Sequence, residues 1–541
     1  MTDDRPHPSA SDAATAVAHH RAGRLEEAAR AYAQIIEREP RNAHAAHNLG
    51  VVQLALGQAQ AAEASFARTL EISPDHLDAQ VNRGTALKAM GRLDEAERCY
   101  RDAIAHDPRN RTAVRNLGIL LNLAERHAES LAAADEALAL ERHPEGLIMR
   151  GDALYGLGRF AEALQSYSQA AGLAPQPYET LIKQALAHAG LRQYDEALAL
   201  LDRAVALRPQ DHLAYHQRAS IRLMICDFEG GWRDFEHRWR NDLFLASSSA
   251  LVSPQVRDRL DLRLGIGDLR GQRVLLVAEQ GIGDEVMFAS MIPDVAAVAQ
   301  SVVCVCDPRL VGLFANSFPG VRFFGPAGAS LRPSDFDKVV AMGSLGHAFR
   351  QRLEDFPGTP YLRPRAEVAE RWAARLGPPP KGLRIGVSWR GGTPGTGASQ
   401  RSLTLVDLAP VLNLPGCQIV SLQYGDHRAE IEAASAALGR DIIVFPPGEI
   451  DDFEELAGLI ANLDVVVSVQ TSVVHLTGAL GTDCLAMVPY NPIWRYTAHA
   501  SVMPWYRSVR LLRQAKPNAW EPVVQDVAEI LKARARSPGR S

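Results

Sequence analysis

The residues best placed to do chemistry follow the first predicted strand of the C-terminal half. The chain continues there as Gln280-Gly-Ile-Gly-Asp-Glu285. Glycine has no Cβ, so Gly281 and Gly283 would let the backbone of this turn pass close to a ligand. Asp284 would then project into a cleft. The alternative is that Asp284 and the following glutamate only favour a helix N-terminus through the helix dipole.

A second strand-to-helix turn is a candidate anion site. In Val467-Ser-Val-Gln-Thr-Ser-Val473, the hydroxyls of Thr471 and Ser472 lie beside backbone N–H groups that the first turn of a helix leaves without partners. A phosphate or diphosphate could bind there. His475, one turn further along, would either face the strand and steady the turn or contact the ligand.

Two arginines flank a loop rich in glycine, threonine and proline, at residues 391–400. The guanidiniums of Arg390 and Arg401 could neutralise a phosphate without a metal. Alternatively, both are solvated loop residues. Gln423 directly follows a predicted strand and is a candidate nucleoside contact.

These residues must be positioned by alternating strands and helices, which predict an α/β region. A first lobe at 272–376 has expected strands at 273–278, 301–306 and 337–341, and a helix at 285–299. A Pro-rich hinge at 377–382 separates it from a second lobe at 383–535, with expected strands at 384–389, 418–422, 441–444, 464–469 and 484–488. Ligands bind outside the carboxyl ends of the strands in such sheets, so a cleft is expected between the lobes.

The first half carries an internal repeat of 34 residues. Prolines mark it at 40, 74, 108, 175 and 209, and glycines at 23, 57, 91 and 158. The spacing is typical of tetratricopeptide (TPR) helix pairs, and roughly six units would fill residues 13–240. The fourth unit is the weakest because Glu125 replaces the turn glycine. Residues 1–12 would be a disordered N-terminus, 241–271 a junction and 536–541 a tail.

A TPR array binds peptide or protein segments on its concave surface. Asn48, Asn82 and Asn116 recur at the repeat period, so they would line one face of the array. An Asn side chain offers a donor and an acceptor, so such a ladder could pair with the backbone of an extended peptide. The alternative is that these residues only support local structure.

Length and composition set the broad class. The 541 residues exceed what one hydrophobic core usually serves, and a net charge of −5 gives no general attraction to nucleic acid or an anionic membrane. Six scattered cysteines with no CxxC pair indicate reduced thiols. The N-terminus lacks the pattern of a signal peptide, and no apolar run approaches the roughly 18 residues of a spanning helix. We expect a soluble, cytoplasmic protein.

Four motifs of the C-terminal half together resemble a known family. They are Gln280 to Glu285, Trp389-Arg-Gly-Gly392, Arg401-Ser-Leu403 and Gln470-Thr-Ser-Val-Val-His-Leu476. In order and spacing these motifs resemble the bacterial heptosyltransferase-like (glycosyltransferase family 9-like) enzymes of GT-B fold, over about 272–532.

The order of the two halves strengthens this resemblance. A TPR array ahead of such a domain, with Asp227-Phe-Glu-Gly-Gly-Trp232 and Phe235-Glu-His-Arg238 at the junction, is similar to bacterial TPR glycosyltransferases, some of which modify flagellin. The plan is also similar to that of O-GlcNAc transferase. The expected fold is therefore an α-helical TPR superhelix followed by an α/β GT-B fold of two Rossmann-like lobes.

The resemblance implies an inverting, metal-independent glycosyltransferase. Asp284 would be the general base, Arg401 a phosphate contact, and a nucleotide-sugar the co-substrate, with no further cofactor. The acceptor would be a hydroxyl on a protein held by the TPR array, or alternatively a lipid or surface polysaccharide. Gln470 stands where the family has Asp. This departure supports another alternative, a TPR adaptor without turnover.

Overall fold

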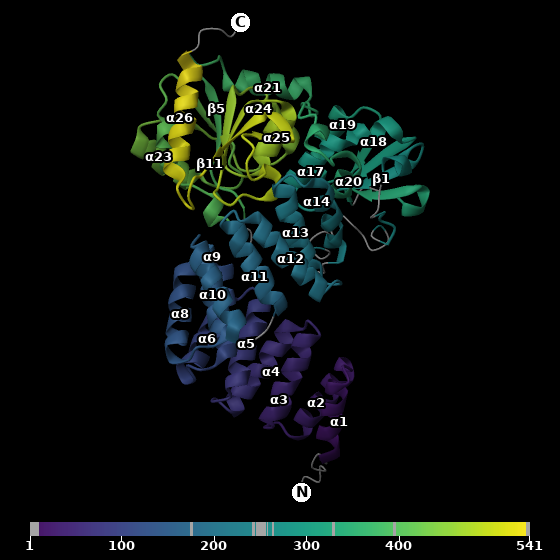
Figure 1. Cartoon of the computed structure of the whole chain (residues 1–541), viewed down its shortest axis with the longest axis vertical. Coiled ribbons are helices and arrows are strands. Elements are labelled where there is room, and N and C mark those ends of the chain that lie inside the picture. Colours follow the sequence, from purple (N-terminus) through teal and green to yellow (C-terminus); the bar gives the residue numbers. More distant parts are fainter. Residues whose placement is uncertain are drawn as a thin grey trace. The chain divides into compact units, whose positions relative to one another are not determined.

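The computed structural model describes residues 10–173, 177–240, 244, 256, 258–261, 265–326, 331–392 and 397–536. The chain divides into two compact units, Met1–Leu191 and Arg192–Ser541 (Figure 1). The predicted disordered N-terminus, most of the predicted junction and nearly all of the predicted tail lie outside the described residues.

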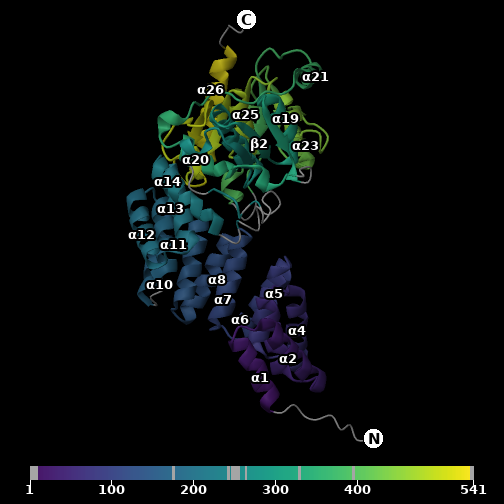
Figure 2. The same cartoon turned by 90° about the vertical axis from the view of Figure 1, so that its right-hand side faces the viewer.

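The first unit consists of helices joined by short turns, and Figure 2 shows their packing from the side. Its helices are α1 (Ala10–Arg21), α2 (Leu25–Arg38), α3 (Ala43–Ala55), α4 (Ala59–Ile72), α5 (Leu77–Ala89), α6 (Leu93–His106), α7 (Arg111–Leu123), α8 (His127–Leu140), α9 (Pro144–Gly156), α10 (Phe160–Leu173) and α11 (Pro177–Gly190). The repeat continues in the second unit with α12 (Tyr194–Leu207), α13 (His212–Met224) and α14 (Phe228–Phe235). The described residues thus hold enough helices for seven repeats, where about six were expected.

The repeat has a physical basis in the packing within each helix pair. A Cβ on Gly84 would lie 2.6 Å from the ring of Tyr100, sixteen residues later, so only a residue without a side chain fits there. The turn between paired helices is left-handed even where glycine is missing, with φ 56° at Glu125, 62° at Arg192 and 67° at Cys226. The fourth unit therefore keeps the repeat's turn although its sequence signal is weak.

The first lobe of the second unit is a parallel sheet of order β3-β2-β1-β4 with short helices around it. Its strands are β1 (Arg273–Val277), β2 (Ser301–Val305), β3 (Val321–Phe324) and β4 (Lys338–Ala341). Its helices are α17 (Ile282–Phe288), α18 (Ile292–Val298), α19 (Val311–Ser317) and α20 (Leu345–Phe349). The single helix expected at 285–299 is instead α17 and α18, separated by a 3-10 turn just before Pro293, which has no N–H to donate.

The second lobe is a seven-stranded sheet of order β10-β11-β9-β8-β5-β6-β7, parallel except for the edge pair β10 and β11. Its strands are β5 (Arg384–Ser388), β6 (Gln418–Ser421), β7 (Ile442–Ile443), β8 (Val465–Ser468), β9 (Cys484–Val488), β10 (Val502–Met503) and β11 (Tyr506–Arg513). Its helices are α21 (Ala366–Leu376), α22 (Ala409–Leu412), α23 (Arg428–Leu438), α24 (Phe453–Ile460), α25 (Ser472–Leu480) and α26 (Trp520–Arg536). The expected strands are confirmed to within two residues, whereas β3, β10 and β11 were not predicted.

The predicted hinge at 377–382 is wrong. Helix α21, which precedes it, already packs on α24 of the second lobe, where Gly458 lies against Val368 and Trp372 (Figure 1). The chain passes from the first lobe to the second before α21, because Tyr361 N already donates a hydrogen bond to Ala479 O of α25, at 2.9 Å. The proline run marks a turn between α21 and β5 rather than the border between the lobes.

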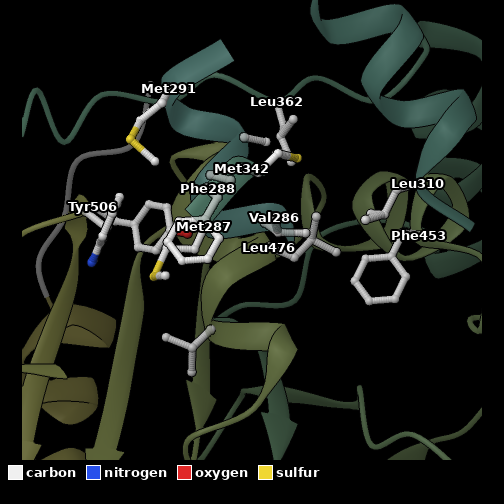
Figure 3. Close-up of a cluster of buried hydrophobic side chains, with 14 of the residues drawn as sticks. Val286, Met287, Phe288, Met291, Leu310, Met342, Leu362, Phe453, Leu476 and Tyr506 are labelled. Atoms are coloured by element: carbon white, nitrogen blue, oxygen red, sulfur yellow. The ribbon is translucent and has the colours of Figure 1, made fainter. Parts of the chain in front are cut away.

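The repeat helices run to α14, close to the predicted end of the array at residue 240, but the border between the two compact units lies earlier, at Leu191 and Arg192. Leu223 and Trp232, from α13 and α14, belong to the buried cluster that contains Phe288, Leu476 and Tyr506 of the two lobes. Figure 3 shows the part of this cluster in which residues of α17 meet α25 and β11. Helices α12–α14 have the repeat sequence, yet they fold with the α/β region.

No helix in the described part of the chain is both long and apolar enough to cross a membrane.

Candidate functional site

Asp284 lies where the two lobes meet. It occupies the first turn of α17, directly after β1, and its carboxylate forms an ion pair with Arg495 of the second lobe. Arg495 Nη2 also donates a hydrogen bond to Gln280 Oε1 at 3.3 Å. The side chains of Asp284 and Arg495 are only 13% and 14% exposed. The first-lobe motif is thereby joined to Trp494–Tyr496, a short 3-10 turn that the sequence analysis did not single out.

Burial raises the pKa of Asp284, because removing a carboxylate from water disfavours its charged form. The positive charge of Arg495 and a backbone N–H act in the opposite direction. A carboxyl group with a raised pKa is a better proton acceptor than an ordinary surface aspartate. Since Asp284 also lies in the first turn of α17, interaction with the helix dipole remains part of its environment.

The second predicted turn begins α25, and it packs directly against α17. Thr471 is the N-cap, and its Oγ1 accepts a hydrogen bond from Val473 N at 3.2 Å, while Ser472 is the first helical residue. A Cβ on Gly283 would lie 3.3 Å from His475 Cδ2 and 3.4 Å from Ser472 Cα. Gly283 therefore serves the close approach of two helices, whereas a Cβ on Gly281 would meet Asp284 Oδ2 at the ordinary contact distance of 3.7 Å.

His475 lies inside the protein and supports the structure. Its ring is 4% exposed, and Nδ1 is 3.4 Å from the Tyr506 hydroxyl. Burial lowers its pKa to about 3, and the charge of Arg495 acts in the same direction. The imidazole is therefore neutral at physiological pH. Of the two interpretations from the sequence, the geometry favours the residue that steadies the turn.

The predicted nucleoside contact Gln423 also holds the loop after β5. Its Oε1 accepts hydrogen bonds from the backbone N–H groups of Trp389 and Arg390, each at 2.9 Å, and its Nε2 donates to Arg390 O at 3.2 Å. A Cβ on Gly391 would lie 2.8 Å from Gln470 O, so this loop is packed on the turn that begins α25. Gln423 thus positions the loop through its side-chain amide.

The two predicted phosphate arginines have different surroundings. Arg390 is 43% exposed and forms an ion pair with Glu430 at 2.9 Å. Arg401 ends the 3-10 turn Ser399–Arg401 and lies close enough to Tyr496 to lower the pKa of that hydroxyl, against the larger effect of burial. Residues 393–396 of the intervening loop lie outside the described part of the chain.

A small cavity of about 80 Å³ opens at the carboxyl ends of β6 and β7. Its lining includes Gln423, Asp426 and His427 after β6, and Phe445 and Pro446 after β7. Ligands bind at this end of the strands in doubly wound sheets. The lining of the cavity therefore includes both an aromatic residue and polar residues.

The loop that carries Asp284 is held from behind by the two junction motifs. Arg238 is 2% exposed, and it binds both carboxylate oxygens of Glu279, the residue before Gln280, at 2.7 Å. Glu279 Oε1 also accepts from Gly343 N at 2.9 Å. The motif Phe235-Glu-His-Arg238 thus fixes the end of β1, a role the sequence analysis did not assign.

The turn that carries Arg495 is held by the same helices. Trp494 packs edge-on against Trp232, with ring centroids 5.6 Å apart, and Ala498 N donates to Met224 O at 2.7 Å. Helices α13 and α14 and the 3-10 turn Glu236–Arg240 therefore support both members of the Asp284–Arg495 pair. Nothing in the repeat pattern indicated this, because these contacts are made with the α/β region, outside the repeat.

The predicted asparagine ladder lies on α3, α5 and α7, where all three side chains are half-buried. Asn82 Nδ2 is 3.2 Å from His47 Nε2, and Asn116 Nδ2 donates to Thr85 Oγ1 at 3.4 Å. Asn48 Nδ2 contacts His44 of its own helix at 3.1 Å. Two of the amides therefore link neighbouring repeats, which gives the ladder a structural role in addition to any peptide contact.

Among the described residues, no group of three or more His, Cys, Asp or Glu side chains converges as metal ligands would. In the Asp335-Phe-Asp337 segment, Asp337 accepts from the Arg273 backbone N–H at 2.9 Å and pairs with its guanidinium. Asp337 thereby ties β4 to β1.

Comparison with known proteins identifies the helical part. Models of the tetratricopeptide repeat match residues 9–34, 41–109, 81–146 and 148–212. Solved structures similar to the chain include a TPR protein from Parabacteroides merdae (17% identity, 42% of this chain and 90% of that one, TM-score 0.38). Another is the TPR protein TTC0263 of Thermus thermophilus (23%, 33% and 98%, TM-score 0.29). Together with the 34-residue period, the repeat models show that the N-terminal region is a TPR array, an architecture that binds protein or peptide partners.

A curated relative extends the similarity further along the chain. Protein FlbA of Caulobacter vibrioides is 31% identical over 343 residues, which cover 59% of this chain and 55% of FlbA. The chain thus spans about half the length of this relative. Because the repeat helices end before Arg240, a match of this extent continues into the α/β region.

Proposed function

We propose that the chain is a glycosyltransferase of the GT-B type, which moves a sugar from a nucleotide-sugar to a hydroxyl group of a protein bound by the TPR array. The observation that carries this proposal is the meeting of two sites from two parallel-stranded lobes. Asp284, a carboxyl group whose pKa is raised by burial, follows Gly283, which packs on the first turn of α25, and pairs with Arg495.

Each part of this arrangement suits one part of the reaction. The N-terminus of α25 and the nearby arginines would bind the donor diphosphate, since helix N–H groups and guanidiniums both favour anions. The acceptor hydroxyl would attack the sugar C1 on the face opposite the diphosphate. A C1–O bond forms to the acceptor, the C1–O bond to the diphosphate breaks, and Asp284 takes the hydroxyl proton. The cationic groups stabilise the negative charge of the leaving group.

The cavity after β6 and β7 is suited to the base of the donor. Among its lining residues, Phe445 would supply apolar contact, and His427 and Gln423 would supply polar contacts. We infer a nucleoside diphosphate-sugar as donor and leave the base and the sugar to experiment.

Gln470 is compatible with this donor site although the related family has Asp. The residue is 3% exposed, and neither amide atom of its side chain has a hydrogen-bond partner among the described residues. A buried amide without a partner costs free energy, so a polar ligand at this turn would stabilise it. A neutral amide also repels a diphosphate less than a carboxylate would.

Intact-mass spectrometry of proteins co-purified with the full chain tests the proposal. Wild type is compared with Asp284→Asn and with Asp337→Asn, which changes an aspartate of the same lobe outside the site. We expect a partner with an added sugar mass for wild type and Asp337→Asn, and the unmodified mass for Asp284→Asn.

Two other outcomes would favour the alternatives. Identical partner masses for all three proteins would exclude protein glycosylation and favour a TPR adaptor. A sugar transferred only to lipid or polysaccharide in the same cells would retain the chemistry and change the acceptor.

A further inference from the structure

Arg495 is held in place by aromatic packing rather than by its ion pair alone. Its guanidinium carbon lies 5.0 Å from the ring centroid of Trp494. Trp494 packs edge-on against Trp232 and Phe235, at centroid distances of 5.6 and 6.0 Å. Because the aromatic cluster fixes this turn, the positive charge would stay near α25 if Asp284 moved away.

The groups that the described structure places near Arg495 include one carboxylate, that of Asp284, together with neutral or uncharged groups such as the Tyr496 hydroxyl. Asp284 and Gln280 accept its hydrogen bonds. His475, near enough for Arg495 to lower its pKa, is neutral, and His216 on α13 has its pKa lowered by burial and, to a lesser extent, by Arg495. Asp284 is therefore the charged partner that balances Arg495.

The adjoining turn of α25 supplies a second, independent sign of a ligand. The helix has nine residues, and its first turn approaches Gly283 of α17, one residue from Asp284. Gln470, just before the N-cap, has an amide that is buried without a described partner. A phosphate group bound here would face a guanidinium, a helix N-terminus and an amide donor.

We propose that Arg495 binds a phosphate group of the ligand at this turn, and that Asp284 occupies Arg495 until that ligand arrives. A carboxylate and a phosphate both present two oxygens to a guanidinium, so they compete for it. The diphosphate carries more charge and displaces Asp284. The freed carboxylate can then act as the base, so donor binding switches on proton transfer. The identity of the ligand as a nucleotide-sugar rests on the proposed function, whereas the competition for Arg495 does not.

Titration calorimetry of the full chain with inorganic pyrophosphate measures the competition directly. Arg495→Met should weaken binding by about tenfold or more, since it removes a charge-assisted hydrogen bond. Asp284→Asn should strengthen binding several-fold because it removes the internal competitor. In the Arg495→Met background, Asp284→Asn should give no such gain. Arg233→Met, which changes an exposed arginine of α14, should bind as wild type does.

Some results with these variants would contradict the proposed competition for Arg495. Unchanged affinity in Arg495→Met would show that Arg495 does not bind the anion. An equal effect of Asp284→Asn with and without Arg495 would show that the two anions do not compete for it. If Arg495→Met fails to fold, Arg495→Lys, which keeps the charge but loses the planar fork, should bind with intermediate affinity, and affinity equal to wild type would overturn the proposal.

The same proteins separate this inference from the proposed function. If the affinities for pyrophosphate change as expected in the Arg495 and Asp284 variants while the wild-type chain modifies no partner, the result would support the anion site and refute glycosyl transfer. Normal partner modification, together with a pyrophosphate affinity that is unchanged by substitution of Arg495, would support glycosyl transfer and refute the anion site.

Discussion

The helix pairs α5–α6 and α13–α14 have the same repeat pattern, but their aromatic side chains are buried against different neighbours. Tyr100 of α6 belongs to a small cluster confined to residues 81–121. Trp232 of α14 belongs to a large cluster that includes residues as distant as Leu511. The repeat register sets the contact inside a helix pair, whereas residues outside it, such as Trp232 and Arg238, decide which compact unit the pair joins. Repeat identity and domain membership are therefore separate properties of this chain.

Shortening the chain at two places gives the largest expected effect. A protein of residues 192–541 keeps α12–α14 and should unfold in one cooperative transition. A protein of residues 241–541 loses them, exposes the aromatic surface that they cover, and should lack a cooperative transition. Circular dichroism during heating distinguishes the two. Equal transition temperatures would show that α12–α14 are not part of the second unit's core.

Loss of the buried Arg238–Glu279 ion pair, which follows α14, should lower stability more than loss of an ion pair within the array. Arg238→Met leaves Glu279 buried and unpaired, which should lower the free energy of unfolding by about 3–5 kcal/mol. Arg83→Met breaks the more exposed pair with Glu63 and should cost less than about 1 kcal/mol. Hydrogen exchange measured for each unit tests this difference. Similar losses from both substitutions would contradict the structural role assigned to Arg238.

The second unit should lose stability in acid through His475. Its pKa of about 3 in the folded protein is below the ordinary value of 6.5, so between these values the unfolded chain binds more protons. Stability from this residue is therefore lost as pH falls from about 6.5 towards 3, by about 1.4 kcal/mol per pH unit at most. His475→Gln should flatten this slope in urea unfolding of residues 192–541. An unchanged slope would mean that His475 is protonated in the folded protein.

The smallest expected effect concerns the array itself. Gly84→Ala places a methyl group 2.6 Å from the Tyr100 ring and should destabilise the first unit by about 1–3 kcal/mol. Gly172→Ala is the matched control because no atom lies within 4 Å of its added Cβ, and it should stabilise helix α10 by up to about 1 kcal/mol. Neither change should alter hydrogen exchange in the second unit. An equal cost at both positions would point to backbone effects instead of the close contact.

The local elements could be predicted from the residues alone. The 34-residue period marked the helix pairs, and in three of them a glycine packs against an aromatic ring sixteen positions later: Gly50 on Phe66, Gly84 on Tyr100 and Gly151 on Tyr167. Buried apolar runs likewise fixed the central strands. Strand β11 escaped prediction because its arginines interrupt the apolar pattern, and its place beside β9 is set by pairing across the sheet.

Long-range packing sets which elements belong to the same compact unit and which functional groups meet. The proline run after Gly377 looked like the hinge, but the packing of α21 on α24 moves the border of the lobes. Asp284 and the turn at Thr471 stood out from their residue types and spacing. Arg495 did not, since a single arginine in a loop has no local signature. Its role follows from long-range packing of Trp494 on Trp232, which depends on contacts that no sequence window contains.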